Sequence, residues 1–152
     1  MKLDEMLASR HIPFERIHHR PAYAANRTAQ VLHVRGKDVA KTVLLRTDRG
    51  YVLAVVPATH RLDLAELQKQ LGYEDVELAG EGEMDRLFPD CEPGAIPPFG
   101  SIYNLPTLMD ESLAADEKIV FDAQSHEEAI RMSYKDYEAI EHPVKCRFAH
   151  HV

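Results

Sequence analysis

The chain has 152 residues, 45% of them hydrophobic, and carries a formal net charge of −7 at pH 7. This length and composition allow a substantial core, so we expect one domain over residues 1–152 that needs no disulfide or metal for stability. Two distant cysteines outside any CxxC pattern, no signal-like start and no apolar run near ~20 residues disfavour a disulfide framework and a membrane protein, and favour the cytoplasm.

Hydrophobic periodicity predicts short helices and strands that interleave along the chain. Helices are predicted at residues 3–9, from Asn26 or Thr28 to about 33, and at 64–71, 83–88 and 134–140. Strands are predicted at residues 14–17, 39–47, 51–57, 74–78, 105–109 and 118–121. Residues 128–132 fit a strand or a helix, and residues 149–152 are expected to be a frayed end.

Local signals support several of these elements. Asp63 is a good N-cap and Gly72 a good C-terminal residue for the helix between them, and Ser133 begins a capping-box pattern. The segments 39–47 and 51–57 predict a hairpin with a glycine-containing turn, and their apolar residues on both faces indicate central strands covered on both sides. We therefore expect a mixed sheet with helices packed against it.

A stretch rich in glycine and proline occupies residues 91–100. It holds two Gly and three Pro, together with the apolar Ile96 and Phe99. Proline restricts the backbone and glycine permits unusual conformations and close approach, so this loop is expected to be rigid and shaped. Two interpretations stay open: a structural turn whose apolar residues fill the core, or a pocket wall that presents backbone N–H groups to a polar ligand atom.

Charge is unevenly distributed along the chain. Residues 1–50 hold 10 Lys and Arg against 5 Asp and Glu, whereas residues 51–152 hold 8 against 20. The negative total disfavours a non-specific nucleic-acid binder, but cations that share a face would form a small basic patch. Ordinary solvated charges explain the same composition equally well. The cations concerned are Arg16, Arg20, Arg27, Arg35, Lys37, Lys41, Arg46 and Arg49.

Two further residues are candidates for a catalytic or ligand-binding role. If residues 40–47 form a strand, Lys41 shares its face with Val43 and Leu45. An ammonium group there either reaches solvent or meets an anionic or carbonyl partner. His126 follows a later strand, where a histidine is more often a polar loop residue than a general base.

Several common site patterns are absent from the sequence. There is no GxSxG, no GxxxxGK[ST] and no GxGxxG after a strand, which disfavours nucleophile-elbow hydrolases and nucleotide-binding enzymes. The nine histidines include no HExxH motif. We therefore expect neither a metal site nor a cofactor.

Four segments in order, residues 39–45, 52–64, 94–100 and 119–126, resemble the YbaK/ProX family, which also occurs as the editing insertion of bacterial prolyl-tRNA synthetases. The similarity runs from about residue 3 to residue 143. It implies a single α/β domain of the α+β type, with a mixed, partly barrel-like sheet flanked by helices. It also implies an aminoacyl-tRNA deacylase, which hydrolyses the ester joining a small non-cognate amino acid to the 3′ end of a tRNA.

The resemblance implies particular catalytic residues. Lys41 matches the functional lysine of the family, Gly94 and Pro98 match its Gly-x-x-x-Pro loop, and His126 matches the histidine of its Gly-Ser-His segment. Gln124 stands where that segment usually has Gly. Negative charge develops on the carbonyl oxygen during ester hydrolysis, and a preformed donor typically contributes about 3–4 kcal/mol there.

Backbone N–H groups of the loop and the Lys41 ammonium are suitable donors, although this lysine could instead bind the terminal phosphate or ribose. A water oriented by the ribose hydroxyl of the substrate would need no general base besides His126 and no covalent intermediate. Further substrate contacts are expected from Ile96, Phe99, Gly100, Asp110 and Ser125. Contacts to the tRNA acceptor end are expected from Arg20, Arg27, Arg35 and Lys37.

Two other functions stay open. An idle relative of the family would bind tRNA, another nucleic acid or an aminoacyl-tRNA synthetase without turnover, and its RNA binding would depend on salt. Alternatively, the pocket could hydrolyse another small ester or amide. The sequence is compatible with removal of Ala, Ser, Thr or Cys, because one methylene changes selectivity by only about 1–3 kcal/mol.

Overall fold

The computed structural model of the chain describes residues 2–22 and 25–151. In these residues the strands form sheets of five, three and two members. The strands are β1 (Glu15–His18), β2 (Ala40–Thr47), β3 (Gly50–Pro57), β4 (His60–Leu62), β5 (Val76–Leu78), β6 (Thr107–Asp110), β7 (Lys118–Ser125), β8 (Glu128–Ser133), β9 (Val144–Cys146) and β10 (Ala149–His151). The helices are α1 (Lys2–Ser9), α2 (Ala25–Leu32), α3 (Leu64–Leu71), α4 (Glu81–Leu87) and α5 (Tyr134–Glu141), with short 3₁₀ helices η1 (Gly36–Asp38), η2 (Gly100–Tyr103) and η3 (Glu111–Ala115).

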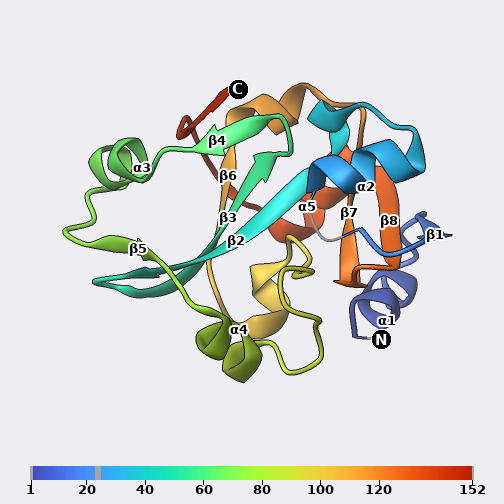
Figure 1. Cartoon of the computed structure of the whole chain (residues 1–152), viewed down its shortest axis with the longest axis horizontal. Helices are drawn as coiled ribbons and strands as arrows, with labels where there is room; N and C mark the ends of the chain where they lie inside the picture. Colours follow the sequence, from blue (N-terminus) through green and yellow to red (C-terminus); the bar gives the residue numbers. More distant parts are fainter. Residues whose placement is uncertain (1, 23–24, 152) are drawn as a thin grey trace.

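The five-stranded sheet has the order β5-β2-β3-β6-β9 and is mixed, as predicted. The hairpin of β2 and β3 is antiparallel, whereas β6 pairs in parallel with both β3 and β9. Figure 1 shows this long hairpin crossing the molecule, with α3 above the end that carries its turn. Leu45 packs in a cluster with Leu67 of α3, and Leu44 packs in another with Ile96, which confirms that the hairpin is covered on both faces.

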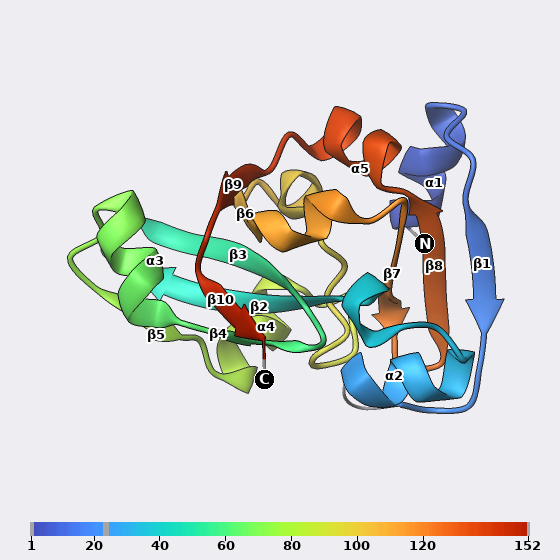
Figure 2. The same ribbon diagram turned by 90° about the horizontal axis from the view of Figure 1, so that it is seen from above.

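The three-stranded sheet, in the order β1-β8-β7, stands beside the larger one (Figure 2). Figure 2 shows α2 and α5 on opposite sides of this region. A parallel bridge between Val39 and Val120 links the start of β2 to β7. The mixed α/β architecture is thus confirmed, but in the described residues the sheets do not close into a barrel, because this bridge is not continued as a ladder.

Local capping signals placed several helix ends correctly. The Asp63 carboxylate accepts a hydrogen bond from the backbone N–H of Glu66 at 3.0 Å, and Gly72 ends α3 with φ 72°. The Ser133 hydroxyl accepts from the N–H of Asp136 at the start of α5. The predicted start of α2 was wrong: the helix already begins at Ala25, so Asn26 and Thr28 lie inside it.

The predicted frayed C-terminus was also wrong for the described part, residues 149–151. Strand β10 pairs with β4, with Ala149 opposite Leu62. Both strands have three residues and gain their order from this distant pairing and from side-chain contacts, so neither shows a clear local pattern. Val152 lies outside the described residues. No helix in the described part of the chain is long and apolar enough to cross a membrane.

Candidate active site

The glycine- and proline-rich loop, residues 91–100, both fills the core and lines a cavity. Ile96 packs with Leu44 and Phe88, and Phe99 makes edge-to-face contacts with Phe121 and Tyr137. The same loop contributes Gly94 and Ile96 to the wall of a cavity of about 750 Å³. The two interpretations drawn from the sequence are therefore compatible, because the buried residues anchor a segment whose other atoms remain accessible.

A bulge in β7 holds this loop from one side. The regular register of β7 with β8 is interrupted between Asp122 and Ser125, and Gln124 within the bulge has φ 72°. The backbone of Gln124 donates to the carbonyl of Ala95 at 3.0 Å and accepts from the N–H of Glu92 at 2.9 Å. This left-handed conformation favours glycine, which gives a physical reason for the Gly that the resemblance implies at this position.

The side chain of Gln124 makes two further hydrogen bonds next to the loop. Its amide nitrogen donates to an Asp90 carboxylate oxygen at 2.7 Å and to the Tyr103 hydroxyl at 2.9 Å. At the far end of the loop, the hydroxyl of Tyr137 donates to the carbonyl of Pro98 at 2.7 Å. The loop is thus fixed at both ends by groups far away in sequence, which suits a preorganised wall.

The cavity lies between β2 and β7, where the two strands part. Because Val39 and Val120 form a parallel bridge, Lys41 and Asp122, each two residues further along, occupy corresponding positions on the two strands. Both line the cavity. The loop spans the gap behind them, since Ile96 packs against β2 while Ala95 is hydrogen-bonded to β7.

Lys41 is half-buried, and in the described residues its ammonium group makes no hydrogen bond or ion pair. The side chains of Lys41 and Leu44 point to opposite faces of β2. Because Ile96 packs against Leu44, Lys41 approaches the cavity from the other face of the strand. Strand β5 covers the neighbouring edge of β2 only at Leu45, Arg46 and Thr47. The edge of β2 next to Lys41 is therefore open to the cavity. Among the described residues, nothing occupies the Lys41 ammonium group, so it is available to a ligand.

The loop offers two unengaged donors. In the part of the chain that the structure describes, the backbone N–H groups of Gly94 and Ile96 donate no hydrogen bond. The N–H groups of Ala95 and Phe99 donate to the carbonyls of Glu92 and Pro97 within the loop. Proline has no N–H, so only the first two amides of this wall are available to a carbonyl oxygen.

His126 lies behind the loop and is absent from the cavity lining. It is buried, with Nε2 2.6 Å from the carbonyl oxygen of Pro93 and Nδ1 3.1 Å from that of Ala22. A Cβ at Gly94 would lie 3.6 Å from its ring, so the imidazole packs against the residue that bends the loop, at φ 83°. We propose a positioning role for His126, since both ring nitrogens face protein carbonyls.

Asp122 is a cavity residue that sequence reasoning missed. Its side chain is 16% exposed, and its Oδ2 atom lies 3.8 Å from Nδ1 of His126. The pKa of this carboxyl is raised to about 7, mainly by burial; His126 opposes the rise and Glu92 adds to it. The available signal was an acidic residue in the strand segment Ile119-Val-Phe-Asp-Ala, which is otherwise apolar. Arg61, exposed at the cavity, was also missed.

Several predicted substrate contacts lie elsewhere. Phe99 and Gly100 are buried behind the cavity wall, and a Cβ at Gly100 would lie only 2.5 Å from the carbonyl oxygen of Leu105. The hydroxyl of Ser125 accepts from the N–H of Glu127 in the turn between β7 and β8. Within the described residues none of these three predicted contacts lines the cavity. We propose that they support the loop and the turn.

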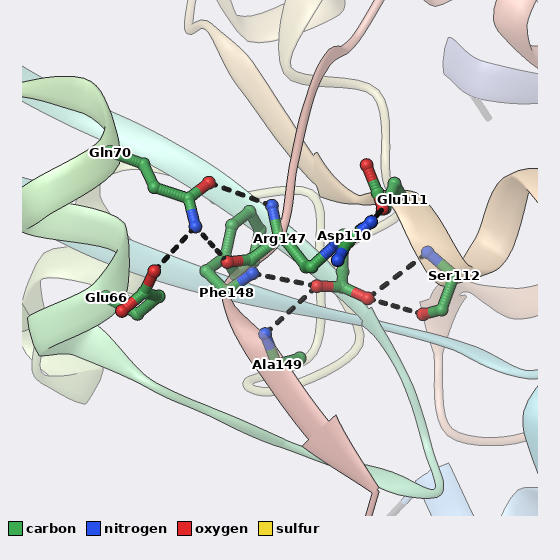
Figure 3. A network of polar contacts seen from close by, with 8 residues as sticks. All are labelled: Glu66, Gln70, Asp110, Glu111, Ser112, Arg147, Phe148 and Ala149. Carbon is green, nitrogen blue, oxygen red and sulfur yellow. Dashed lines mark hydrogen bonds and ion pairs between the residues drawn. The ribbon is translucent and has the colours of Figure 1, made fainter.

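Asp110 holds the C-terminal segment at Phe148 and Ala149 by hydrogen bonds, as Figure 3 shows. One oxygen of its carboxylate accepts from the N–H groups of Phe148 and Ala149 at 2.9 and 3.0 Å. The other accepts from the N–H and hydroxyl of Ser112. The residue is 2% exposed and does not line the cavity. We therefore propose a structural role for Asp110 in place of the predicted substrate contact.

The cations of the N-terminal third do not form one free patch. Arg16 pairs with Asp4 and Glu128, and Arg46 pairs with Glu77 and Glu83. Of the predicted tRNA contacts, two are already engaged: Arg35 with Asp38, and Lys37 with Asp116. Arg20 and Arg27 are exposed, and Arg27 precedes the cavity residue Thr28 on α2. These last two stay our candidates for phosphate contacts.

Comparisons with known proteins identify similar sequences and structures. The family model of the aminoacyl-tRNA editing domain matches residues 19–140. The chain is 32% identical over 87 residues to the proline–tRNA ligase of Xanthomonas axonopodis pv. citri, covering 57% of this chain but only 15% of the ligase. It is 23% identical over 145 residues to the prolyl-tRNA editing protein ProX of Acetoanaerobium sticklandii, covering 91% of this chain and 85% of that protein.

A solved structure described as a candidate trans-editing enzyme for prolyl tRNA synthetase superposes with a TM-score of 0.83 at 21% identity, covering 98% of this chain and 95% of the other. This likeness shows the shared fold. Together with the family match over most of the chain, it confirms the resemblance drawn from the four sequence segments. The chain belongs to the family of aminoacyl-tRNA editing domains, the YbaK/ProX family.

Proposed function

We propose that this chain is an aminoacyl-tRNA deacylase, which hydrolyses the 3′ ester of a small non-cognate amino acid. The observation that carries the proposal is the composition of one cavity. A lysine without an ion pair and a loop with two unengaged backbone donors line it together, within the described residues. The family supports the same reaction at a coarser level, since its members are editing domains.

The loop amides would act on the ester carbonyl. The N–H groups of Gly94 and Ile96 are suited to the oxygen that becomes negatively charged as water adds to the carbonyl carbon. Such donors act strongly when they are fixed in advance and shielded from water. The contacts of Gln124, Tyr137 and His126 hold the loop before the substrate arrives. Collapse of the tetrahedral adduct then releases the free amino acid and the ribose hydroxyl.

Lys41 would hold the acceptor end of the tRNA or stabilise the carbonyl charge. Both roles need a cation that no protein carboxylate neutralises, and Lys41 has no ion pair among the described residues. No covalent intermediate is required, because the attacking water can be oriented by the neighbouring ribose hydroxyl of the substrate. The cavity of about 750 Å³ leaves room for a small aminoacyl group and part of the terminal nucleotide.

The proposed partner is the acceptor end of a mischarged tRNA in the cytoplasm, and an aminoacyl-tRNA synthetase is a further proposed partner. The negative total charge of the chain disfavours a broad grip on a polyanion, so we propose that contact is confined to the acceptor end. The names of the matched relatives point to a tRNA that prolyl-tRNA synthetase charges, and we propose that substrate for the first tests.

A deacylation screen tests the proposal. Purified protein is incubated with tRNAs charged with Ala, Ser, Thr or Cys, and release of the amino acid is followed with time. We expect release from at least one of these esters, and loss of that release in Lys41→Ala. Salt-dependent tRNA binding with no release from any ester would instead favour a binding module.

A further inference from the structure

Asp122 is the only acidic residue that lines the cavity among the described residues. Its Oδ1 atom is buried and has no hydrogen-bond partner in the part of the chain that the structure describes. The other oxygen lies 3.8 Å from the nearest ring nitrogen of His126, which is longer than a hydrogen bond. That nitrogen is instead 3.1 Å from the carbonyl oxygen of Ala22. The carboxylate is therefore poorly satisfied by the protein.

A buried carboxylate without donors is costly, so its presence beside a cavity indicates that a ligand supplies these donors. The ligand group should carry N–H donors and a positive charge. The ester of an amino acid has such a group, because its α-ammonium is attached to the carbon next to the reacting carbonyl. An ester whose amino group is blocked by an acyl chain lacks both the charge and two of the three N–H donors.

The position of Asp122 suits the α-ammonium of an ester whose carbonyl lies at the loop. Gly94, with its unengaged N–H, packs against the His126 ring at 3.6 Å, measured from the position of an added Cβ. Asp122 approaches the same ring on the cavity side. A carbonyl oxygen directed at Gly94 thus leaves the neighbouring α-carbon close to Asp122. Lys41 lies on the opposite strand, where it would meet the anionic acceptor end and not the ammonium.

We propose that Asp122 binds the α-ammonium group of the aminoacyl ester and thereby restricts hydrolysis to esters of free amino acids, an inference that rests on the proposed deacylase function. Esters with a blocked amino group, such as formylaminoacyl- and peptidyl-tRNA, carry the same ester bond and would be spared. The size of the cavity alone would not exclude a small N-acyl group, whereas a charged contact discriminates by chemistry.

The test compares one tRNA in two forms, alanyl-tRNA and chemically prepared N-acetylalanyl-tRNA, or the equivalent pair for the amino acid that is hydrolysed fastest. For the wild-type protein we expect kcat/KM to be at least about 100-fold higher for the free amino ester, because an unpaired buried polar group penalises the blocked analogue. Asp122→Asn should lower kcat/KM for the free ester by roughly 10- to 100-fold and leave the acetylated ester within about twofold, because it removes the charge and keeps the shape.

Glu127→Gln is the matched control. This residue is exposed, lies five positions along the chain and is absent from the cavity lining, so the same loss of charge should leave the preference unchanged. Binding of the stable alanyl amide of 3′-amino-3′-deoxyadenosine, free and N-acetylated, gives a readout that does not depend on turnover. Wild-type protein should bind the free form more tightly, and Asp122→Asn should lose most of this preference.

The outcomes separate the two proposals. Equal hydrolysis of both esters by the wild type would overturn the inference and leave the deacylase function standing. An unchanged preference in Asp122→Asn would also overturn it, because the discrimination would then arise elsewhere. Failure of the wild type to hydrolyse any aminoacyl ester would overturn the proposed function and this inference with it.

Discussion

Replacing Gly94 by Ala perturbs the cavity wall at a single backbone position. Gly94 has φ 83°, and a Cβ there would meet only the His126 ring, at 3.6 and 3.7 Å. These are ordinary van der Waals distances, so the cost comes from the backbone and not from a clash. An L-residue in a left-handed conformation costs about 1–2 kcal/mol, and we expect Gly94→Ala to lower the free energy of unfolding by that amount.

The same change should affect catalysis more than stability. The loop can relieve the strain only by rotating the backbone at residue 94, which re-aims the N–H that we place at the carbonyl oxygen. Loss of one such donor typically lowers kcat by about 100- to 1000-fold. Gly50→Ala is the matched control, because Gly50 has φ 101° with no atom within 4 Å of an added Cβ and is the first residue of β3, next to the distant turn between β2 and β3.

Urea denaturation and single-turnover deacylation measure the two effects on both variants. We expect a similar loss of stability in Gly94→Ala and Gly50→Ala, with a fall in rate only in the first. If both variants lose about 1–2 kcal/mol and both keep the wild-type rate, the loop is a structural turn and the reasoning from its donors is refuted.

Three further predictions address other residues. Lys41→Ala should abolish deacylation and change the free energy of unfolding by less than about 0.5 kcal/mol, because Lys41 is half-buried and has no ion pair among the described residues; denaturation and rate measurements together check this. Asp122 has a folded-state pKa raised from 3.8 to about 7, so the folded protein binds its proton more tightly and loses stability as pH rises from about 4 to about 7. Asp122→Asn should remove that loss, which is at most about 4 kcal/mol, and a variant with the same decline as wild type between pH 4 and pH 8 would contradict it. Asp110→Ala leaves the N–H groups of Phe148 and Ala149 without their acceptor, so it should lower stability by about 2–4 kcal/mol in denaturant titrations while kcat/KM measured well below the melting temperature stays within about twofold.

Features encoded by neighbouring residues could be predicted from the sequence. The helix of residues 64–71 was predicted with its observed ends because Asp63 and Gly72 act within one turn of them. The β2–β3 hairpin was predicted because its apolar runs flank a short turn containing glycine. The loop of residues 91–100 was identified as shaped from its Gly and Pro content alone.

Features that depend on distant contacts were missed. The carboxylate of Asp110 accepts hydrogen bonds from backbone N–H groups 38 and 39 residues away, and no local sequence pattern predicts such a contact. His126, which the resemblance implied to be catalytic, is buried and lies against the carbonyls of Ala22 and Pro93. Asp122 lines the cavity because the fold brings β7 next to β2, which carries Lys41. In each case the surroundings of the side chain are formed by residues that are distant in sequence and meet only in the folded chain.

The rate of amino-acid release under single-turnover conditions tests the central claim most directly. Excess wild-type protein and excess Lys41→Ala are mixed separately with a tRNA carrying a labelled small non-cognate amino acid, and the free amino acid is counted with time. We predict rapid release by the wild type and a rate close to spontaneous hydrolysis for the variant. Equal rates for the two proteins, or no release above the spontaneous rate by the wild type with any of the four small amino acids, would contradict the claim that this cavity is a deacylase site.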